Sequence, residues 1–396
     1  MSAEIQTLSE NPNLRRWQIV VLVIGVIGLI ACAVGWMVEP TQFYRSYLTA
    51  YIFWVGLAVG CLGVLMLQFV TGGRWGLILR RPLEAASLTF PLLAVLFVPI
   101  LFGLPNLYVW MNAAVVAADE VLRKKQGYLN EPFFIARAIV YFVVWISIAY
   151  FLNRWSRLRQ SSDDKVKYQW RLEHLGGWGM FLTAIVVSLA VIDWVMSLEP
   201  RWYSTIYAVA FVAGEMLAAF ALTIMTTLIF PIPAPLAEII GKERLRALGN
   251  LLLAFVMLWA YCAYSQYLLI WSGNLRDEIT WYLPRTAGGW GWIAIGLIVL
   301  HFFLPFFLLL SRDLKDKGRT LLGIALLIFA LRYVDVFWLV KPAFTPEGLS
   351  LSWLDFAAPI GLGGVWLAYF LWLFERQPLP LGEIEEEIEK EKEKEN

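Results

Sequence analysis

The chain consists of long apolar segments separated by short polar connections. A helix of about 20 apolar residues crosses the roughly 30 Å hydrocarbon core of a bilayer. Only helices suit such segments, because lipid offers no hydrogen-bond partner to an unpaired backbone. The pattern predicts about ten membrane-spanning helices, at residues 17–38, 46–71, 83–104, 133–152, 175–196, 204–231, 248–271, 290–311, 319–340 and 353–374.

The polar segments complete this plan. Residues 1–16 form a polar N-terminus, and residues 375–396 form a tail rich in Glu and Lys. The longest loop, 105–132, has helical periodicity from Trp110 to Lys125, which predicts a helix along the surface. Connections on the side of the N-terminus carry more Lys and Arg than those on the other side, which predicts that both termini are cytoplasmic.

Composition agrees with a membrane protein. Of the 396 residues, 60% are hydrophobic and only 16% are charged, whereas soluble domains contain roughly 25% charged residues. A globular α/β enzyme is therefore excluded, and the net charge of +1 gives no indication of nucleic-acid binding. The fold class we predict is an all-α integral membrane protein. Prolines inside the predicted spans, at positions 91, 99 and 305, predict kinks.

A weak internal repeat suggests how the helices are grouped. Asp193 is followed by Pro200, and Asp335 is followed at the same spacing by Pro342. A second set of residues matches at one constant offset: Ser46, Ala50, Phe53 and Gly56 with Ser204, Ala208, Phe211 and Gly214. These matches predict two four-helix bundles, the second to fifth and the sixth to ninth spans, with two peripheral helices. Chance similarity among apolar helices is the alternative.

Ionisable residues inside spans are costly and are therefore candidates for function. Glu215 lies near the middle of 204–231, where it is either a proton relay or a permanently protonated hydrogen-bond partner. Asp335 follows Arg332 by three residues on one helical face, which predicts an ion pair or a switchable partner. Asp193 lies close to the end of its span and is either a solvated interfacial acid or functional.

The two histidines and Glu84 are further candidates for a proton path. His301 lies in the middle of 290–311 and is either a hydrogen-bonded core residue or a group that passes protons. His174 and Glu84 lie toward the cytoplasmic side, where protons would be taken up. The protons would leave near Asp335 and Asp193.

A polar cluster follows the seventh span. Gln266, a further candidate for the proton path, lies just inside the membrane, and the loop beyond it contains Ser272, Asn274, Arg276, Asp277 and Glu278. A rigid lid over a polar cavity and an ordinary interfacial belt of aromatic and polar residues are both consistent with this pattern.

The sequence also limits redox chemistry. His174 and His301 are the only two histidines, too few to ligate two b haems, and the motif Cys-x-x-Cys-His is absent. The three cysteines have no spacing typical of a metal site, a disulfide or an iron–sulfur cluster. We therefore predict no metal site, no covalently bound cofactor and no redox centre in this chain.

Three long motifs resemble the F subunit of bacterial alternative complex III. They are Asp193 to Pro200 with Trp202 to Tyr207, Met257 to Tyr261 with Ser265 to Leu275, and Arg332-Tyr333-Val334-Asp335 with Trp338 to Val340. The resemblance covers nearly the whole chain from about Leu14 to Phe374 and leaves out the glutamate-rich tail.

The resemblance implies a fold, a complex and a location. The complex is a quinol:electron-acceptor oxidoreductase of the bacterial inner membrane, and its F subunit is similar to membrane anchors of the NrfD and polysulfide-reductase type. The implied partners are membrane lipid, a second NrfD-like quinol-binding subunit, an iron–sulfur subunit, c-type cytochrome subunits and small membrane subunits, but no nucleic acid. The resemblance also implies quinone or quinol as a possible ligand of this chain, but no diagnostic motif here assigns a quinone site to it.

Three functions follow from these observations. The first is a non-redox subunit that conducts protons coupled to quinol oxidation. The second is a structural anchor that binds its partners, lipid or quinone. A secondary transporter is the third, but transporters usually have broken helices at matching positions of both halves. Here Pro91 and Pro99 have no counterpart in 248–271.

Overall fold

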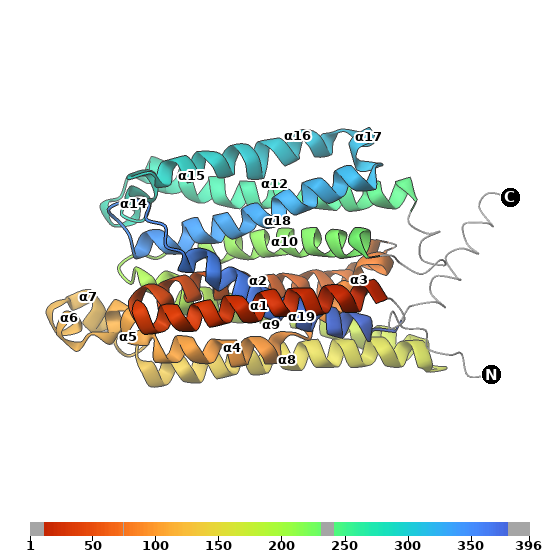
Figure 1. Cartoon of the computed structure of the whole chain (residues 1–396), viewed down its shortest axis with the longest axis horizontal. Coiled ribbons are helices and arrows are strands. Elements are labelled where there is room, and N and C mark those ends of the chain that lie inside the picture. The colour runs from red at the N-terminus through yellow and green to blue at the C-terminus, as the bar shows by residue number, and fades with distance from the viewer. Residues whose placement is uncertain (1–11, 74, 231–240, 379–396) are drawn as a thin grey trace.

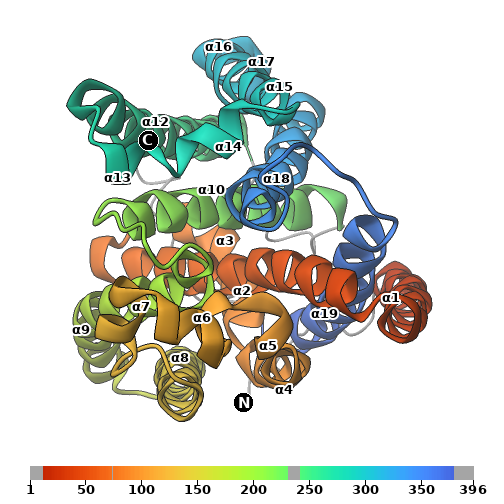
Figure 2. The same cartoon turned by 90° about the vertical axis from the view of Figure 1, so that its left-hand side faces the viewer.

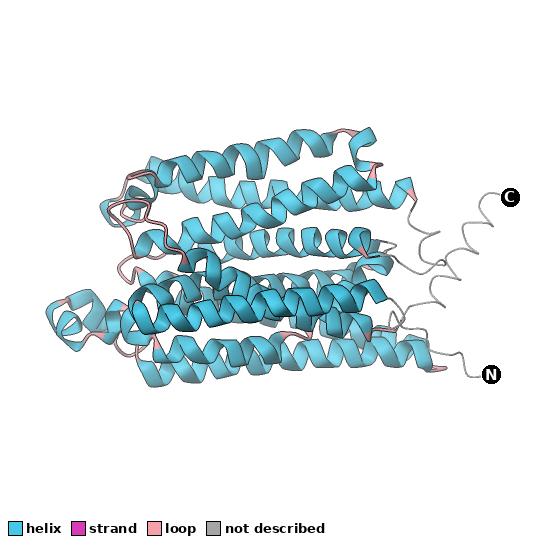
Figure 3. Cartoon of the chain, viewed as in Figure 1, coloured by secondary structure: helices cyan, strands magenta, loops and turns pink. Residues whose placement is uncertain are grey.

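The computed structural model describes residues 12–73, 75–230 and 241–378. Within these ranges the chain forms helices joined by short loops (Figure 3). Most of the predicted tail and N-terminal segment therefore lies outside the described residues.

The predicted fold class and the approximate number of spans are confirmed. In the described part of the chain, nine helices are long and apolar enough to cross a membrane, and a bent pair of helices adds a tenth. The chain is an all-α, multi-pass membrane protein. The unbroken spans are α1 (Pro12–Val38), α2 (Pro40–Thr71), α8 (Glu131–Ser161), α9 (Lys165–Trp194), α10 (Tyr207–Ile229), α12 (Lys242–Gly273), α18 (Gly318–Val340) and α19 (Leu354–Glu375).

The third span is broken. It consists of α3 (Trp75–Ser87) and α4 (Phe90–Phe102), whose axes differ by 41°. Pro91 lies in the first turn of α4, where it lacks the amide hydrogen needed to continue α3. The kink predicted at Pro91 is therefore confirmed.

The eighth span changes its helical register. It runs through α15 (Trp290–Gly296), the π-helical segment η4 (Leu297–Phe303) and α16 (Leu304–Leu310). Pro305 has no amide hydrogen for the carbonyl group of His301, four residues earlier. The wider register, in which Leu304 donates to the carbonyl oxygen of Val299, accommodates this loss.

The helices form the two predicted bundles. The first contains α2, α3, α4, α8 and α9, and the second contains α10, α12, α18 and the eighth span. Helices α2 and α10 lie side by side where the bundles meet (Figure 2). The core of the molecule is therefore the α2–α10 contact.

The first and last helices pack mainly against each other at one flank (Figures 1 and 2). Their backbones approach closely at glycines, as is common between membrane helices: a Cβ atom on Gly25 would lie 2.6 Å from the carbonyl carbon of Gly364. Asp355 joins α19 to α2 and to the residue that follows α18, because its carboxylate accepts hydrogen bonds from Ser46 at 2.6 Å and from Lys341 at 2.7 Å. In Figure 1, α1 begins and α19 ends at the same end of the molecule.

Short helices cover the opposite end (Figure 1). The single surface helix predicted from Trp110 to Lys125 is wrong, because this segment divides into η2 (Val109–Met111), α6 (Ala113–Ala118) and α7 (Glu120–Lys125). Asn112 and Asp119 cause the division, since each side chain accepts backbone hydrogen bonds and caps a new helix. The other short helices are α5 (Leu104–Leu107), η3 (Met196–Leu198), α13 (Arg276–Ile279), α14 (Tyr282–Thr286) and η5 (Lys341–Ala343), with α17 (Arg312–Lys315) elsewhere.

Candidate functional site

Glu215 lies at the contact between the two bundles. It belongs to α10 and is fully buried against two glycines of α2. A Cβ atom on Gly60 would lie 2.2 Å from the carbonyl oxygen of Glu215, and one on Gly56 would lie 2.5 Å from its carboxyl carbon. The absence of side chains at these positions therefore lets α2 approach α10 and leaves space for the carboxyl group.

Arg332 of α18 joins Glu215 to a second acid. Its Nη2 atom donates to Glu215 Oε1 at 3.0 Å and to the carbonyl oxygen of Phe211 at 3.1 Å. Its Nη1 atom donates to Asp335 on the same helix. We call Glu215, Arg332 and Asp335 the central cluster. The ion pair predicted between Arg332 and Asp335 is confirmed, but its contact with Glu215 could not be predicted.

Two residues of the second bundle extend the central cluster. The indole Nε1 of Trp259 donates to Asp335 Oδ2 at 3.0 Å. The ring of His301 meets that indole edge to face, with 4.4 Å between ring centroids. His301 is fully buried on the π-helical segment, and neither of its ring nitrogens has a hydrogen-bond partner. The structure thus places His301 beside the cluster but not in direct hydrogen-bond contact with it.

The hydrogen bonds of the central cluster are unequally shared. Asp335 accepts from both Arg332 and Trp259, whereas Glu215 Oε2 is buried and has no partner. The cluster contains two carboxyl groups and one guanidinium group, so it is neutral when one proton is bound and carries a charge of −1 when none is. A buried net charge is costly, which favours the neutral state of the cluster.

Asp193 forms a separate and closed cluster in the first bundle. Arg137 of α8 donates to both carboxylate oxygens, at 2.7 and 3.0 Å, and Tyr141 donates to Oδ2 at 2.6 Å. Asp193 is fully buried, so its interpretation as a solvated interfacial acid is wrong. One positive and one negative charge balance each other here. The two aspartates singled out by the repeat are therefore both paired with a buried arginine, one in each bundle.

A third ion pair, of a buried arginine and a half-buried glutamate, lies at the end covered by short helices. Arg285 of α14 donates to Glu199 Oε2 at 2.7 Å and to the carbonyl oxygens of Leu339 and Trp281 at 2.8 and 2.7 Å. Tyr207 is close enough to this pair and to Arg332 and Asp335 to interact electrostatically with both. Sequence reasoning missed Arg285, because nothing in its short loop marks it as buried.

The two candidates for proton uptake have different surroundings. Glu84 of α3 is fully buried and is hydrogen-bonded by Arg81 and by Ser156 of α8. His174 is exposed on α9, where its Nδ1 atom lies 2.8 Å from the carbonyl oxygen of Trp170. Only Glu84 thus belongs to the buried interior.

The polar loop after α12 remains apart from these clusters. Ser272, Asn274, Arg276 and Asp277 are exposed, and Asn274 ends α12 in a left-handed conformation with φ of 46°. Glu278 is half-buried and contributes its carbonyl oxygen to a hydrogen bond from Trp202 at 3.1 Å. Gln266 is buried on α12.

The buried histidine and carboxyl groups are of the types that ligate metal ions. Across the described ranges, no three His, Cys, Asp or Glu side chains are arranged to hold a metal ion. The central cluster contains two carboxyl groups, but the guanidinium of Arg332 occupies the space between them.

Comparison of the chain with protein-family models and with curated proteins gave no match. Function is therefore inferred from the buried side chains and from the motifs of the sequence.

Proposed function

We propose that this chain is a membrane subunit of a bacterial quinol:electron-acceptor oxidoreductase of the alternative complex III type. It has no redox centre of its own, lies in the inner membrane with both termini in the cytoplasm, and contributes a proton path coupled to quinol oxidation. The three sequence motifs support the complex. A single observation supports the path: Glu215 has an unpartnered carboxylate oxygen within a buried cluster of two acids and one guanidinium.

Glu215 is the proton-carrying member of the central cluster. Asp335 is held by two donors, so its carboxylate is stabilised in the ionised form and neutralises Arg332. The proton that completes neutrality then resides on Glu215, whose Oε2 atom is available for exchange. Quinol oxidation in a neighbouring subunit supplies the free energy. Its coupling to this chain is conformational or electrostatic, because a change in the field at Arg332 alters the affinity of Glu215 for its proton.

Glu84 is the group that supplies protons from the cytoplasmic half. It is fully buried, and its partner Arg81 has two further nitrogens without hydrogen-bond partners. Such a site exchanges protons only through water that reaches it from the membrane surface.

A structural anchor is the second candidate function, and the closed pairs favour it. Two buried ion pairs have matched charges and join separate helices, as expected of ion pairs with a structural role: Arg137 with Asp193, and Lys341 with Asp355. In that case, replacements at Glu215 would alter assembly and leave turnover unchanged. A transporter is disfavoured, because the break between α3 and α4 has no counterpart in the continuous helix α12.

Two experiments test the proposal. Purification in mild detergent through a tag on the C-terminal tail, followed by a reduced-minus-oxidised spectrum, should show c-type haem bands from bound partners. A colourless, monodisperse single subunit contradicts the complex.

The second experiment measures proton release per quinol oxidised by the assembled complex in vesicles. Glu215→Gln should abolish the part of this release that depends on this chain, while the haem content of the complex stays normal. Glu131→Gln, on the exposed start of α8, is the control. Unchanged proton release in Glu215→Gln contradicts the relay role.

A further inference from the structure

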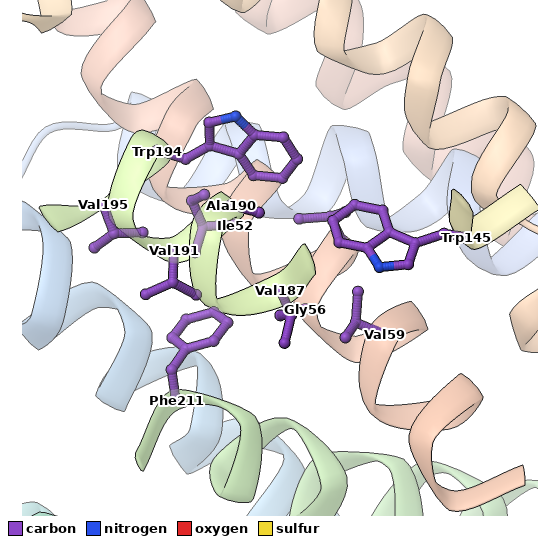
Figure 4. A pocket seen from close by; sticks show the side chains of 11 residues that line it. Ile52, Gly56, Val59, Trp145, Val187, Ala190, Val191, Trp194, Val195 and Phe211 are labelled. Carbon is purple, nitrogen blue, oxygen red and sulfur yellow. The ribbon is translucent and has the colours of Figure 1, made fainter. Parts of the chain in front are cut away.

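Hydroxyl groups without partners gather on the outer face of α12. By contrast, the small cavity between α2, α8, α9 and α10 is lined by aliphatic and aromatic side chains and by Gly56 (Figure 4). Helix α12 lies at the edge of the molecule (Figure 2), and only 33% of its apolar stretch is buried. The residues of the outer face follow at helical spacing: Ala254, Met257, Tyr261, Tyr264, Leu268 and Trp271. Two tyrosines thus stand on a face that this chain leaves uncovered.

The side chains of these tyrosines project away from the second bundle. Tyr261 is 68% exposed and Tyr264 is 61% exposed. In the described part of the chain, neither hydroxyl group has a hydrogen-bond partner, and the neighbouring hydroxyl of Ser265 has none either. A hydroxyl group inside a helix often bonds to a carbonyl oxygen four residues earlier, as Ser188 does with Ala184 at 2.7 Å. The hydroxyl groups of this face therefore require a partner from outside the chain.

The depth of the two tyrosines places them within the hydrocarbon. Tyr261 precedes Trp271 by ten residues and Tyr264 precedes it by seven, which corresponds to about 15 and 10 Å along the helix. Tyrosines of an interfacial belt lie at the level of the lipid headgroups instead. Lipid tails contain no hydrogen-bond acceptor, and an unsatisfied polar group among them is costly. Lipid alone is therefore a poor match for this face.

We propose that the outer face of α12 binds a transmembrane helix of a partner subunit, which accepts hydrogen bonds from Tyr261 and Tyr264. The docking of this helix rests on the proposed function, because the partner is a subunit of the oxidoreductase complex. Residues 254–271 contain no charged side chain, so the partner helix is expected to be uncharged along the contact. Small residues and the side chains of Ser, Thr, Asn and Gln are typical of such contacts between membrane helices.

A quinone and a second copy of this chain are the other occupants that carry acceptors. A small ligand is usually held in a concave site, whereas these tyrosines project from the convex surface of one helix. In a two-fold pair of this chain, the same patch would face itself. Only one of two facing hydroxyl groups donates to the other, so half of the donors would stay unpaired. A helix with acceptors of its own satisfies both tyrosines.

Tyr261→Phe/Tyr264→Phe is the first test, because it removes only the two hydroxyl groups. During a detergent challenge of the assembled complex, retention of this chain with the haem-containing subunits should weaken about fivefold, as expected for the loss of two interhelical hydrogen bonds. Tyr203→Phe is the matched control: it removes a hydroxyl group from a residue that is 70% exposed in the loop before α10, and retention should stay normal. Normal retention in the double variant overturns the inference.

The unfolding temperature of the separated full chain distinguishes docking from a role in this chain's own fold. The double variant should unfold at the same temperature as the unchanged chain or above it, because its hydroxyl groups have no partner within the chain. A lower unfolding temperature would show that the hydroxyl groups stabilise the chain itself, and would also overturn the inference.

A photo-crosslinker identifies the occupant. With p-benzoylphenylalanine in place of Tyr261, illumination of the assembled complex should yield an adduct with an apolar segment of a different subunit, mapped by mass spectrometry of its peptides. The same sample kept in the dark is the control. An adduct between two copies of this chain, an adduct with quinone or lipid alone, or the absence of any adduct overturns the inference.

These outcomes separate the docking face from the proposed function. Haem bands in the purified complex together with normal retention of the double variant leave the proposed function and remove the docking face. A colourless single subunit removes both.

Discussion

Gly56 of α2 and Gly214 of α10 lie at matching positions of the internal repeat and flank the central cluster. A Cβ atom on Gly56 would overlap the carboxyl group of Glu215, and one on Gly214 would lie 2.4 Å from the guanidinium carbon of Arg332. Two glycines thus provide the space for one ion pair. Their match in the sequence reflects the fold, because each occupies the corresponding position in the first helix of its bundle.

Gly214→Ala should therefore destabilise the protein. The new methyl group displaces Arg332 from Glu215, and overpacking of this kind costs about 1–3 kcal/mol. Thermal unfolding in detergent measures the effect. Gly323→Ala on α18 is the control, since its Cβ atom meets nothing within 4 Å; it should be neutral or slightly stabilising. Equal unfolding temperatures of the two variants would show that Gly214 is not under steric constraint.

Asp193→Asn should be among the most damaging single changes. It leaves the guanidinium of Arg137 buried without a counter-charge, which typically costs about 3–5 kcal/mol. The double variant Arg137→Gln/Asp193→Asn removes both charges and should recover part of the loss. The yield of monodisperse protein and its unfolding temperature report both effects. A double variant no better than Asp193→Asn contradicts this account.

Trp259→Phe tests the donor that fixes Asp335. The change keeps an aromatic ring beside His301 and removes one hydrogen bond to a charged group, worth about 1.5–3 kcal/mol. Trp292→Phe, at a position where the tryptophan is 76% exposed, is the control. The unfolding temperature should fall for Trp259→Phe and not for Trp292→Phe.

The loop formed by α6 and α7 should loosen only in acid. Hydrogen bonds from Arg201 lower the pKa of Asp119 below its ordinary value. A group whose pKa is lowered by folding contributes stability above its unfolded pKa of about 3.9. That contribution is lost as the pH falls through the folded value. Amide hydrogen exchange of residues 113–125, corrected for intrinsic rates, should therefore be unchanged between pH 8 and 5 and rise below about pH 4.

Asp119→Asn is the control for this acid response. Asparagine retains an oxygen that can cap α7 but cannot pair with Arg201 as an ion. Its loop should exchange faster than that of the unchanged chain at pH 7 and show little further change in acid. The same steep response in Asp119→Asn would assign the effect to another acid.

The spans, the kink at Pro91 and the grouping into bundles could be predicted from sequence, because they depend on segment length, on proline chemistry and on a repeat. The pair of Arg332 with Asp335 was also predictable, since both lie on one turn of one helix. The contact of Arg332 with Glu215 was not, because these residues come from different helices that are apolar on nearly every side. Such helices carry no pattern that shows which faces meet. For the same reason, the contact of Arg137 with Asp193 could not be predicted from the sequence.

The pairing of α1 with α19 has a consequence for biosynthesis. A membrane protein inserts its helices in the order of synthesis, so α1 enters the bilayer first and its main partner enters last. Until α19 arrives, the glycines of α1 face lipid instead of a matching helix. The bundles can assemble meanwhile, since their own contacts do not require α1. This flank therefore assembles last, and a chain that stops before α19 leaves its first helix without its main partner.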